Sequence, residues 1–313
     1  MRSAGLDSKN PGKSNELKSV LPWSSRVWRL WAPLWENRNR RGPHFFSGFV
    51  TLLTLVLLSP YLIANRLAAD GEHASSPPVS VVDARDSLQQ SQQDARTVWD
   101  PKSVFVDSEG RFLDYQVPFI GWTILIYYTI FVYYFLGPFS APRTDRGRLE
   151  LLLMTQSLIA TCWVAFMIFI ICPAEIDLRW QVEESDVFSG WAGVFYNQFY
   201  WLDRPFNSWP SLHVAQSFII AVGVTRWWRA KGRRVAVILL WLAWTGLALS
   251  ILTTKQHFIW DLITGTALGV VSWRLILTPA FRAIDSLTDS QLRIIAPFVA
   301  TEITRPAKDS LQN

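Results

Sequence analysis

Six long apolar stretches, separated by polar segments, constrain the fold of this chain more than any other feature of its sequence. A helix needs about 20 mostly apolar residues to cross the hydrocarbon core of a bilayer. The stretches run roughly over residues 45–63, 119–136, 149–172, 212–225, 235–252 and 258–277. The fourth is the shortest, and Gln216 and Ser217 interrupt it. The sequence therefore predicts an all-α fold, namely a polytopic membrane protein with six transmembrane helices in a bundle and a site that faces outward.

Composition and charge agree with a membrane protein. The 313 residues are 50% hydrophobic and 18% charged and include 17 Trp, a residue enriched at membrane interfaces. The net charge of +5 could indicate a nucleic-acid partner, but the basic residues cluster before the first span and after the second and fourth. These clusters are Arg38, Arg40 and Arg41; Arg143, Arg146 and Arg148; and Arg226, Arg229, Lys231, Arg233 and Arg234. All three fall on one side of a six-span chain, so we expect an integral protein of a plasma or inner membrane, with both termini cytoplasmic and no nucleic-acid partner.

The polar segments divide the chain into a membrane domain and two tails. Residues 1–44 are expected to form a basic cytoplasmic tail, whose Trp-rich part is either a short helix on the membrane surface or an unstructured segment anchored by Trp. Residues 45–277 are expected to form the six-helix membrane domain, with a flexible outer loop over 65–117. Residues 278–313 form a cytoplasmic C-terminal tail. Cys162 and Cys172 lie about 15 Å apart along the third span, too far for a disulfide.

Two of the four histidines stand where apolar stretches meet outer connections. In the six-span topology the fourth span begins near Ser211 and the fifth ends near residue 252, so His213 and His257 reach the outer face at a similar depth. Asp261 follows His257 by four residues, and on a helix the two side chains share one face and can form a hydrogen bond. Ionisable side chains within a membrane span are costly unless they line a polar cavity and serve a function.

The residues around His213 favour a site for an anion on the outer side, away from the cytoplasm. Pro210 and Ser211 are typical of a helix start, where free backbone N–H groups and the positive end of the dipole attract phosphate. Arg204 and Lys255 add cationic donors near the same place. Two histidines, a carboxylate that orients one of them and an anion site suit phosphoryl transfer through a histidine nucleophile.

Two short motifs resemble those of a known family. "PSLH" at 210–213, followed by "HFIWD" at 257–261, resembles the second and third signatures of the type 2 phosphatidic acid phosphatase superfamily. The resemblance implies a six-helix membrane core with a metal-free His, His, Asp site. Leu212 stands where the phosphatase branch usually has Gly and is similar to the inositol phosphorylceramide synthase (inositolphosphotransferase) branch. "LDYQVPFIGWTILIYY" at 113–128 and "DRPFNSWPSLHVA" at 203–215 also fit that branch.

The resemblance implies a role for each matching residue. The nucleophile, its orienting carboxylate and the acid that protonates the leaving alkoxide are, in that order, His257, Asp261 and His213. The candidates for binding phosphate or the rest of the substrate are Ser211, Arg204, Lys255, Asp114 and Asn207.

Two positions depart from the family pattern. The first phosphatase signature has Lys where this chain has Asn197, and the third has Arg where this chain has Ile251. The cations that bind phosphate must therefore differ, and the sequence offers Arg204, Lys255 or Arg179 as substitutes.

The same residues allow other interpretations. Two histidines and Asp261 could form a metal-binding facial triad, but no further carboxylates accompany them and the cationic surroundings would repel a metal ion, so we expect neither metal nor cofactor. A proton-coupled transporter would spread polar residues over several spans, whereas the first, second and fifth are almost uniformly apolar. A non-enzymatic scaffold would have lost part of the triad, which is intact here. Asp114 could simply cap a turn.

We therefore expect an integral-membrane phosphotransferase or phosphohydrolase that acts on lipid phosphate or phosphodiester head groups through a phosphohistidine. Its partners are a membrane lipid substrate and the bilayer. A simple phosphatase of phosphatidic acid or of a polyprenyl pyrophosphate is the alternative. The sequence leaves the identity of the lipid and the oligomeric state open.

Overall fold

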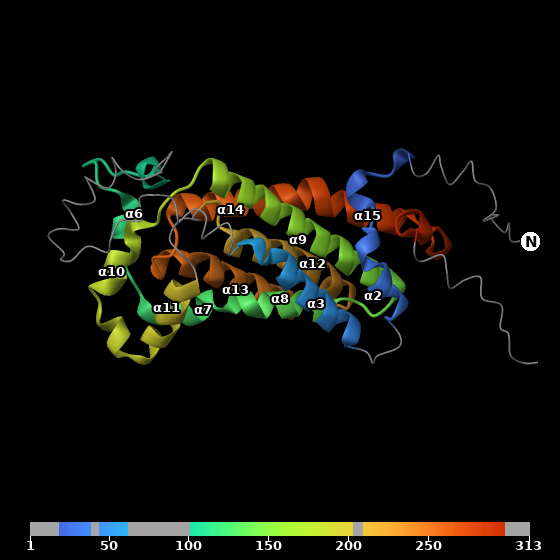
Figure 1. The fold of residues 1–313 in the computed structure, drawn as a ribbon, viewed down its shortest axis with the longest axis horizontal. Coiled ribbons are helices and arrows are strands. Elements are labelled where there is room, and N and C mark those ends of the chain that lie inside the picture. Colours follow the sequence, from blue (N-terminus) through green and yellow to red (C-terminus); the bar gives the residue numbers. More distant parts are fainter. Residues whose placement is uncertain (1–18, 39–43, 62–100, 203–208, 298–313) are drawn as a thin grey trace, which may run out of the picture.

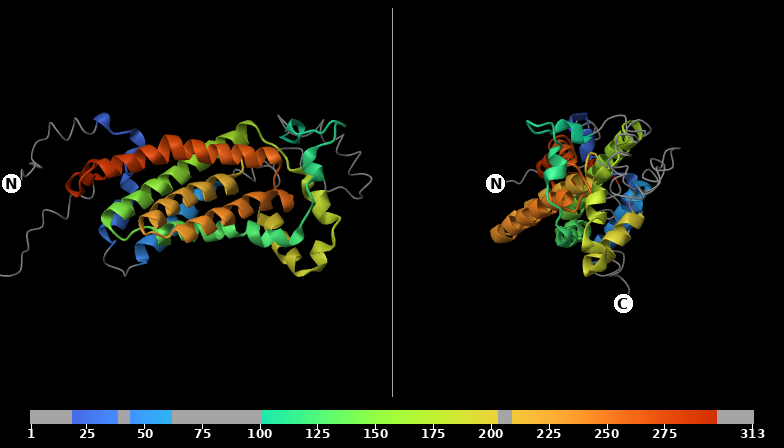
Figure 2. Two further views of the ribbon diagram at one scale, coloured as in Figure 1. Left: turned by 180° about the vertical axis from the view of Figure 1, so that it is seen from behind. Right: turned by 90° about the vertical axis from the view of Figure 1, so that its left-hand side faces the viewer.

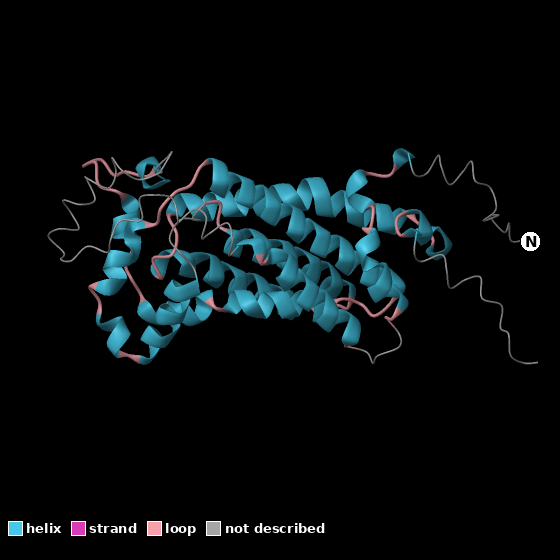
Figure 3. Ribbon diagram, in the orientation of Figure 1, coloured by secondary structure: helices cyan, strands magenta, loops and turns pink. Residues whose placement is uncertain are grey.

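The computed structural model describes residues 19–38, 44–61, 101–202 and 209–297, and their regular structure is helical apart from one isolated bridge between Val106 and Phe112 (Figure 3). The long helices lie side by side in a bundle (Figure 1). They are α3 (Phe45–Leu58), α8 (Thr129–Ser140), α9 (Asp145–Ile171), α12 (Leu212–Ala230), α13 (Arg234–Thr253) and α14 (Ile259–Ser272). The predicted all-α class is confirmed for this part of the chain.

Shorter elements extend two of the long helices. The turn η4 (Gly121–Thr123) and helix α7 (Ile124–Tyr127) lead directly into α8. The π-helical turn η7 (Trp273–Leu277) and helix α15 (Thr278–Ser286) continue α14, so that the run from α14 to α15 extends along most of the bundle (Figure 2). The helix that begins the last predicted span therefore continues past residue 277, into the segment expected as a tail.

Four helical runs are long and apolar enough to cross a membrane. They are Gly121–Ser140, Asp145–Ile171, Arg234–Thr253 and Ile259–Ser286. Among the described residues, α3 is a shorter apolar helix, and α12 is not one of the four. The four runs support an integral membrane protein, whereas the arrangement in six spans stays a prediction.

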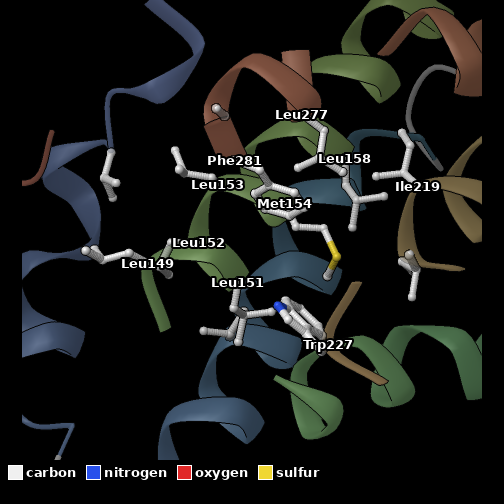
Figure 4. Packing of buried hydrophobic residues seen from close by; sticks show 14 of the residues in the cluster. Leu149, Leu151, Leu152, Leu153, Met154, Leu158, Ile219, Trp227, Leu277 and Phe281 are labelled. Carbon is white, nitrogen blue, oxygen red and sulfur yellow. The ribbon is translucent and has the colours of Figure 1, made fainter. Parts of the chain in front are cut away.

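The apolar side chains in the first half of α9 pack against α12 and α15 (Figure 4). A Cβ atom on Gly223 would lie 2.4 Å from Sδ of Met154, and one on Gly137 would lie 3.0 Å from Cε of the same side chain. Met154 therefore packs directly on the backbone of α12 and α8. Small residues at such contacts let helices approach closely, which matters in a membrane because lipid is as apolar as the helix surface.

The Trp-rich N-terminal stretch packs on the bundle as three short elements, η1 (Trp23–Ser25), η2 (Arg29–Trp31) and α2 (Ala32–Glu36). Trp31 and Trp35 are buried in the same core cluster as the centre of α9, and the backbone N–H of Trp28 donates to Oε1 of Gln156 at 2.9 Å. Protein contacts thus cover Trp31 and Trp35, whereas Trp23 and Trp28 are exposed, and the place of this stretch at the membrane stays a prediction.

The connecting elements gather at one end of the bundle, at the left of Figure 1. They are η3 (Pro101–Val104), α6 (Leu113–Gln116), η5 (Asp177–Arg179), α10 (Trp180–Glu183), η6 (Asp186–Ser189) and α11 (Trp191–Leu202). Of the predicted flexible loop 65–117, residues 65–100 lie outside the described residues, and 101–117 contain η3 and α6. The basic connections that follow α8 and α12 lie at the opposite end (Figure 1).

Candidate active site

His257 and Asp261 are joined by the geometry of one helix start. His257 lies in the loop between α13 and α14, and its Nδ1 is 3.2 Å from Oδ2 of Asp261. Oδ2 also accepts a hydrogen bond from the backbone N–H of Phe258 at 2.9 Å, so the carboxylate is held in place as it orients the imidazole. Both side chains are buried. A carboxylate acceptor at Nδ1 favours the tautomer in which Nδ1 carries the proton, which leaves the lone pair on Nε2.

Ser211 brings the start of α12 against this pair. Its Oγ is 3.5 Å from Nε2 of His257, and its backbone N–H donates to the carbonyl oxygen of Asp261 at 3.2 Å. The approach is close because α14 has Gly265 here, where a Cβ atom would lie 2.5 Å from the backbone oxygen of Ser211. Ser211 occupies the N-cap position of α12, so the unpaired N–H groups of the first turn lie beside its side chain.

His213 lies in the first turn of α12 and faces His257. The two ring centroids are 5.6 Å apart at a T-shaped angle, which places both imidazoles within reach of a single phosphoryl group. Nε2 of His213 is 2.9 Å from the hydroxyl of Tyr127, and the two rings are 4.6 Å apart. Tyr127 is buried in α7 and was not among the residues singled out from the sequence. It lies in an aromatic, apolar run that offers no signal to distinguish it from its neighbours.

Asp114 and Lys255 fasten the loop that carries His257. Oδ1 of Asp114 accepts from the backbone N–H of Ile259 at 2.6 Å and so caps α14, which agrees with the capping role weighed for this residue. Nζ of Lys255 donates to the carbonyl oxygens of Asp114, at 2.9 Å, and of Val117. Both side chains are buried. Helix α6 is therefore attached to the chain on both sides of His257.

The backbone conformation and the buried charges of this loop both cost conformational or electrostatic free energy. Lys255 has a φ of 59°, in the left-handed region where a side chain is disfavoured. Burial raises the pKa of the Asp114 carboxyl to about 6 and lowers the pKa of the Lys255 ammonium to about 8. The sequence suggested Lys255 as a phosphate ligand, whereas in the structure its ammonium donates to backbone carbonyl oxygens.

The remaining predicted residues fall in two groups. Arg204 and Asn207 lie outside the described residues. Arg179, at the end of η5, places its guanidinium 4.3 Å from the ring centroid of Tyr200 in α11. Ile251, which stands where the family has Arg, is buried among apolar side chains of α7, α11 and α12. Within the described ranges no group of three or more His, Cys, Asp or Glu side chains could hold a metal ion.

The apolar helices indicate a membrane protein. Its two facing histidines, one of them paired with a buried carboxylate beside a helix start, are the arrangement expected of a site for phosphoryl transfer. Comparison with protein families agrees with this class, because the model of the PAP2 superfamily matches residues 119–284, more than half of the chain. This protein belongs to the PAP2 superfamily. Comparisons with curated proteins and with solved structures find no match. The family match includes the "PSLH" and "HFIWD" motifs and supports a phosphatase- or phosphotransferase-type enzyme for lipid phosphates.

Proposed function

We propose that this protein is an integral-membrane enzyme that transfers the phosphoryl or phosphodiester head group of a lipid through a covalent phosphohistidine on His257. The observation that carries the proposal is the convergence of four groups from two chain segments. Ser211 and His213 lie at the start of α12, while His257 immediately precedes α14 and Asp261 lies in its first turn. Contacts of 3.2 Å and 3.5 Å join His257 to Asp261 and Ser211, and the ring of His213 lies 5.6 Å from that of His257.

The reaction divides into two steps that share one acid–base group. Nε2 of His257 attacks phosphorus while the bond from phosphorus to the leaving oxygen breaks, and protonated His213 gives its proton to that oxygen. An acceptor hydroxyl then attacks the phosphohistidine, neutral His213 takes the hydroxyl proton, and the bond from phosphorus to nitrogen breaks. Both histidines return to their initial states, so protons and bonds balance over the cycle.

The start of α12 is proposed to hold the phosphate. Ser211 supplies a hydroxyl, and the first N–H groups of a 19-residue helix point their donors and the positive dipole end toward an anion. Arg204 and Asn207 are proposed to complete this site, as the sequence predicts. The contacts of Lys255 and Asp114 favour a different role, in which these residues hold His257 in position and do not touch the phosphate.

The acceptor decides between two related activities. Water as acceptor makes a lipid phosphate phosphatase, and an alcohol makes a head-group transferase similar to inositol phosphorylceramide synthase. Leu212, in place of the small residue of the phosphatase branch, favours the transferase. We further propose six spans with both termini cytoplasmic and the site on the extracytoplasmic side, because the His-bearing ends of α12 and α14 lie opposite the basic connections.

The proposal is tested with purified protein in detergent micelles. Labelled phosphatidic acid and phosphatidylinositol are supplied with and without an alcohol acceptor such as inositol or a ceramide, and free phosphate and new phosphodiester are followed together. His257→Ala should abolish turnover and the acid-labile labelling of the protein, whereas His44→Ala, at the far end of the bundle, should leave both unchanged. Activity that persists in His257→Ala would overturn the nucleophile. Product formed only with the alcohol identifies a transferase, and free phosphate without it identifies a phosphatase.

A further inference from the structure

A cavity of about 550 Å³ opens beside the site, between α3, α8, α9, α11 and α12. Aromatic and aliphatic side chains make up most of its wall, among them Leu58, Ile130, Phe131, Phe166, Phe199 and Leu212. The size lies within the range of ~300–1,000 Å³ that is usual for small-molecule sites. The mechanism described above does not use this cavity.

The wall of the cavity favours an uncharged, apolar ligand. Among the described residues that line it there is no Asp, Glu, Lys or Arg. Its polar members besides His213 are hydroxyl and amide side chains, and two of these are already engaged: the hydroxyl of Tyr128 donates to the carbonyl of Phe195 at 3.0 Å, and the amide of Gln216 donates to Sγ of Cys162. Because most of the wall is apolar, a second phosphate or a sugar would lose more hydration here than the few polar side chains could replace, whereas a hydrocarbon would not.

The cavity is continuous with the reacting groups, because His213 is part of its wall. From there the lining continues three residues along α12 to Gln216, about 4.5 Å by helical rise, and on the neighbouring helix from Tyr128 to Tyr134, about 9 Å. Both helices run from the His-bearing end toward the opposite end of the bundle. A ligand that fills the cavity therefore has one end at His213 and extends along the helices.

We propose that this cavity binds one hydrocarbon chain of the lipid substrate and selects for the length of that chain. The proposal rests on the proposed function, since it takes the head group to lie between His213 and His257. A methylene group takes up about as much space as a water molecule in the liquid, ~30 Å³, so the cavity holds roughly 18 methylenes, one long chain and not two. Any second chain of the substrate remains in the bilayer.

The test uses n-alkyl phosphates from hexyl to octadecyl, which present one chain and one phosphate. Each buried methylene should raise kcat/KM about fourfold until the cavity is full. Leu55→Trp narrows the wall that α3 contributes, and Leu52→Trp places the same residue on the same helix outside the cavity. Leu55→Trp should lower the ratio of hexadecyl to hexyl phosphate activity at least tenfold, and Leu52→Trp should leave the ratio unchanged. Phe131→Ala should shift the optimum to longer chains.

If the larger side chain of Leu55→Trp shifts the preferred chain length down and the smaller one of Phe131→Ala shifts it up, the cavity sets the chain length, since damage to the fold would not produce opposite shifts. Equal ratios in wild type, Leu55→Trp and Phe131→Ala would overturn the proposal. Equilibrium binding of labelled hexadecyl and hexyl phosphate to His257→Ala tests chain binding by the cavity independently of the proposed reaction. Tighter binding of the longer chain to His257→Ala, lost when Leu55→Trp is added, would support the cavity; if the wild-type protein then showed no turnover of any alkyl phosphate, the cavity would stand and the proposed activity would be refuted. Binding that is independent of chain length would overturn the cavity proposal whatever the activity.

Discussion

Replacing Lys255 by Met separates two roles that the sequence leaves together. The ammonium could bind the phosphate, as its place two residues before His257 suggests, or it could hold the loop, as its bonds to the carbonyl oxygens of Asp114 and Val117 indicate. Met keeps most of the unbranched stem and removes only the charge and the donors. The φ of 59° is retained in either case, so the backbone cost at this position does not enter the comparison.

The expected loss follows from the two hydrogen bonds. A hydrogen bond to a charged group contributes about 1.5–3 kcal/mol, and a buried carbonyl left without a donor costs about 1–3 kcal/mol. Since the burial of the ammonium itself offsets part of this, we expect a net destabilisation of about 2–3 kcal/mol and a fall of the melting temperature by roughly 5–10 °C. Because the loop also positions His257, a displacement of about 1 Å would lower kcat by about a hundredfold.

The assay combines thermal unfolding in detergent with steady-state kinetics on a lipid phosphate. Lys231→Met, which removes an exposed ammonium after the end of α12, serves as the matched control and should change neither measurement. A lower melting temperature together with a lower kcat supports the loop-holding role. A large rise in KM with an unchanged melting temperature would refute this reasoning and restore Lys255 as a phosphate ligand.

Three further predictions concern the same end of the bundle. Burial raises the pKa of Asp114 to about 6, so between pH 4 and 6 the folded protein binds this proton more tightly than the unfolded chain, and the resulting stability is lost as pH rises through that window. Asp114→Asn should therefore be more stable than wild type by up to about 3 kcal/mol above pH 6. The melting temperatures of the two proteins should converge below about pH 4. Gly265→Ala should abolish activity because its Cβ would lie 2.5 Å from the oxygen of Ser211, whereas Gly246→Ala, with 3.7 Å to its nearest neighbour, should be tolerated; equal activities would contradict the close approach. Activity should survive chelators, and a loss that a divalent metal restores would contradict the metal-free mechanism.

The pairing of His257 with Asp261 could be predicted because it depends on local spacing. Four residues correspond to about one helical turn, and that regularity holds wherever the segment lies in the bundle. The meeting of His213 with His257 needed only one more assumption, that two antiparallel helices present their ends on one face. The family match over residues 119–284 contains both motifs and is consistent with that assumption.

Long-range contacts made by ordinary-looking residues could not be predicted. Tyr127 lies in an aromatic run of α7 where every neighbour is similarly apolar, and only the position of α7 in the folded bundle, beside α13 and α11, brings its hydroxyl to His213. The capping of α14 by Asp114 joins positions 145 residues apart in the chain. Lys255 resembled a phosphate ligand because its charge is visible in the sequence, whereas the two carbonyl oxygens that engage it are not.

The same contacts explain why the site depends on backbone as much as on side chains. The N–H of Ser211 donates to the carbonyl of Asp261, and Gly265 removes the side chain that would separate the two helices. The start of α12, which is proposed to bind phosphate, and the start of α14, which follows the proposed nucleophile His257, are thereby fixed to one another directly. A substitution that separates these backbones moves Ser211 away from His257 even when every catalytic side chain is kept. The distance between the proposed phosphate site and the proposed nucleophile therefore depends on Gly265, a residue with no chemistry of its own.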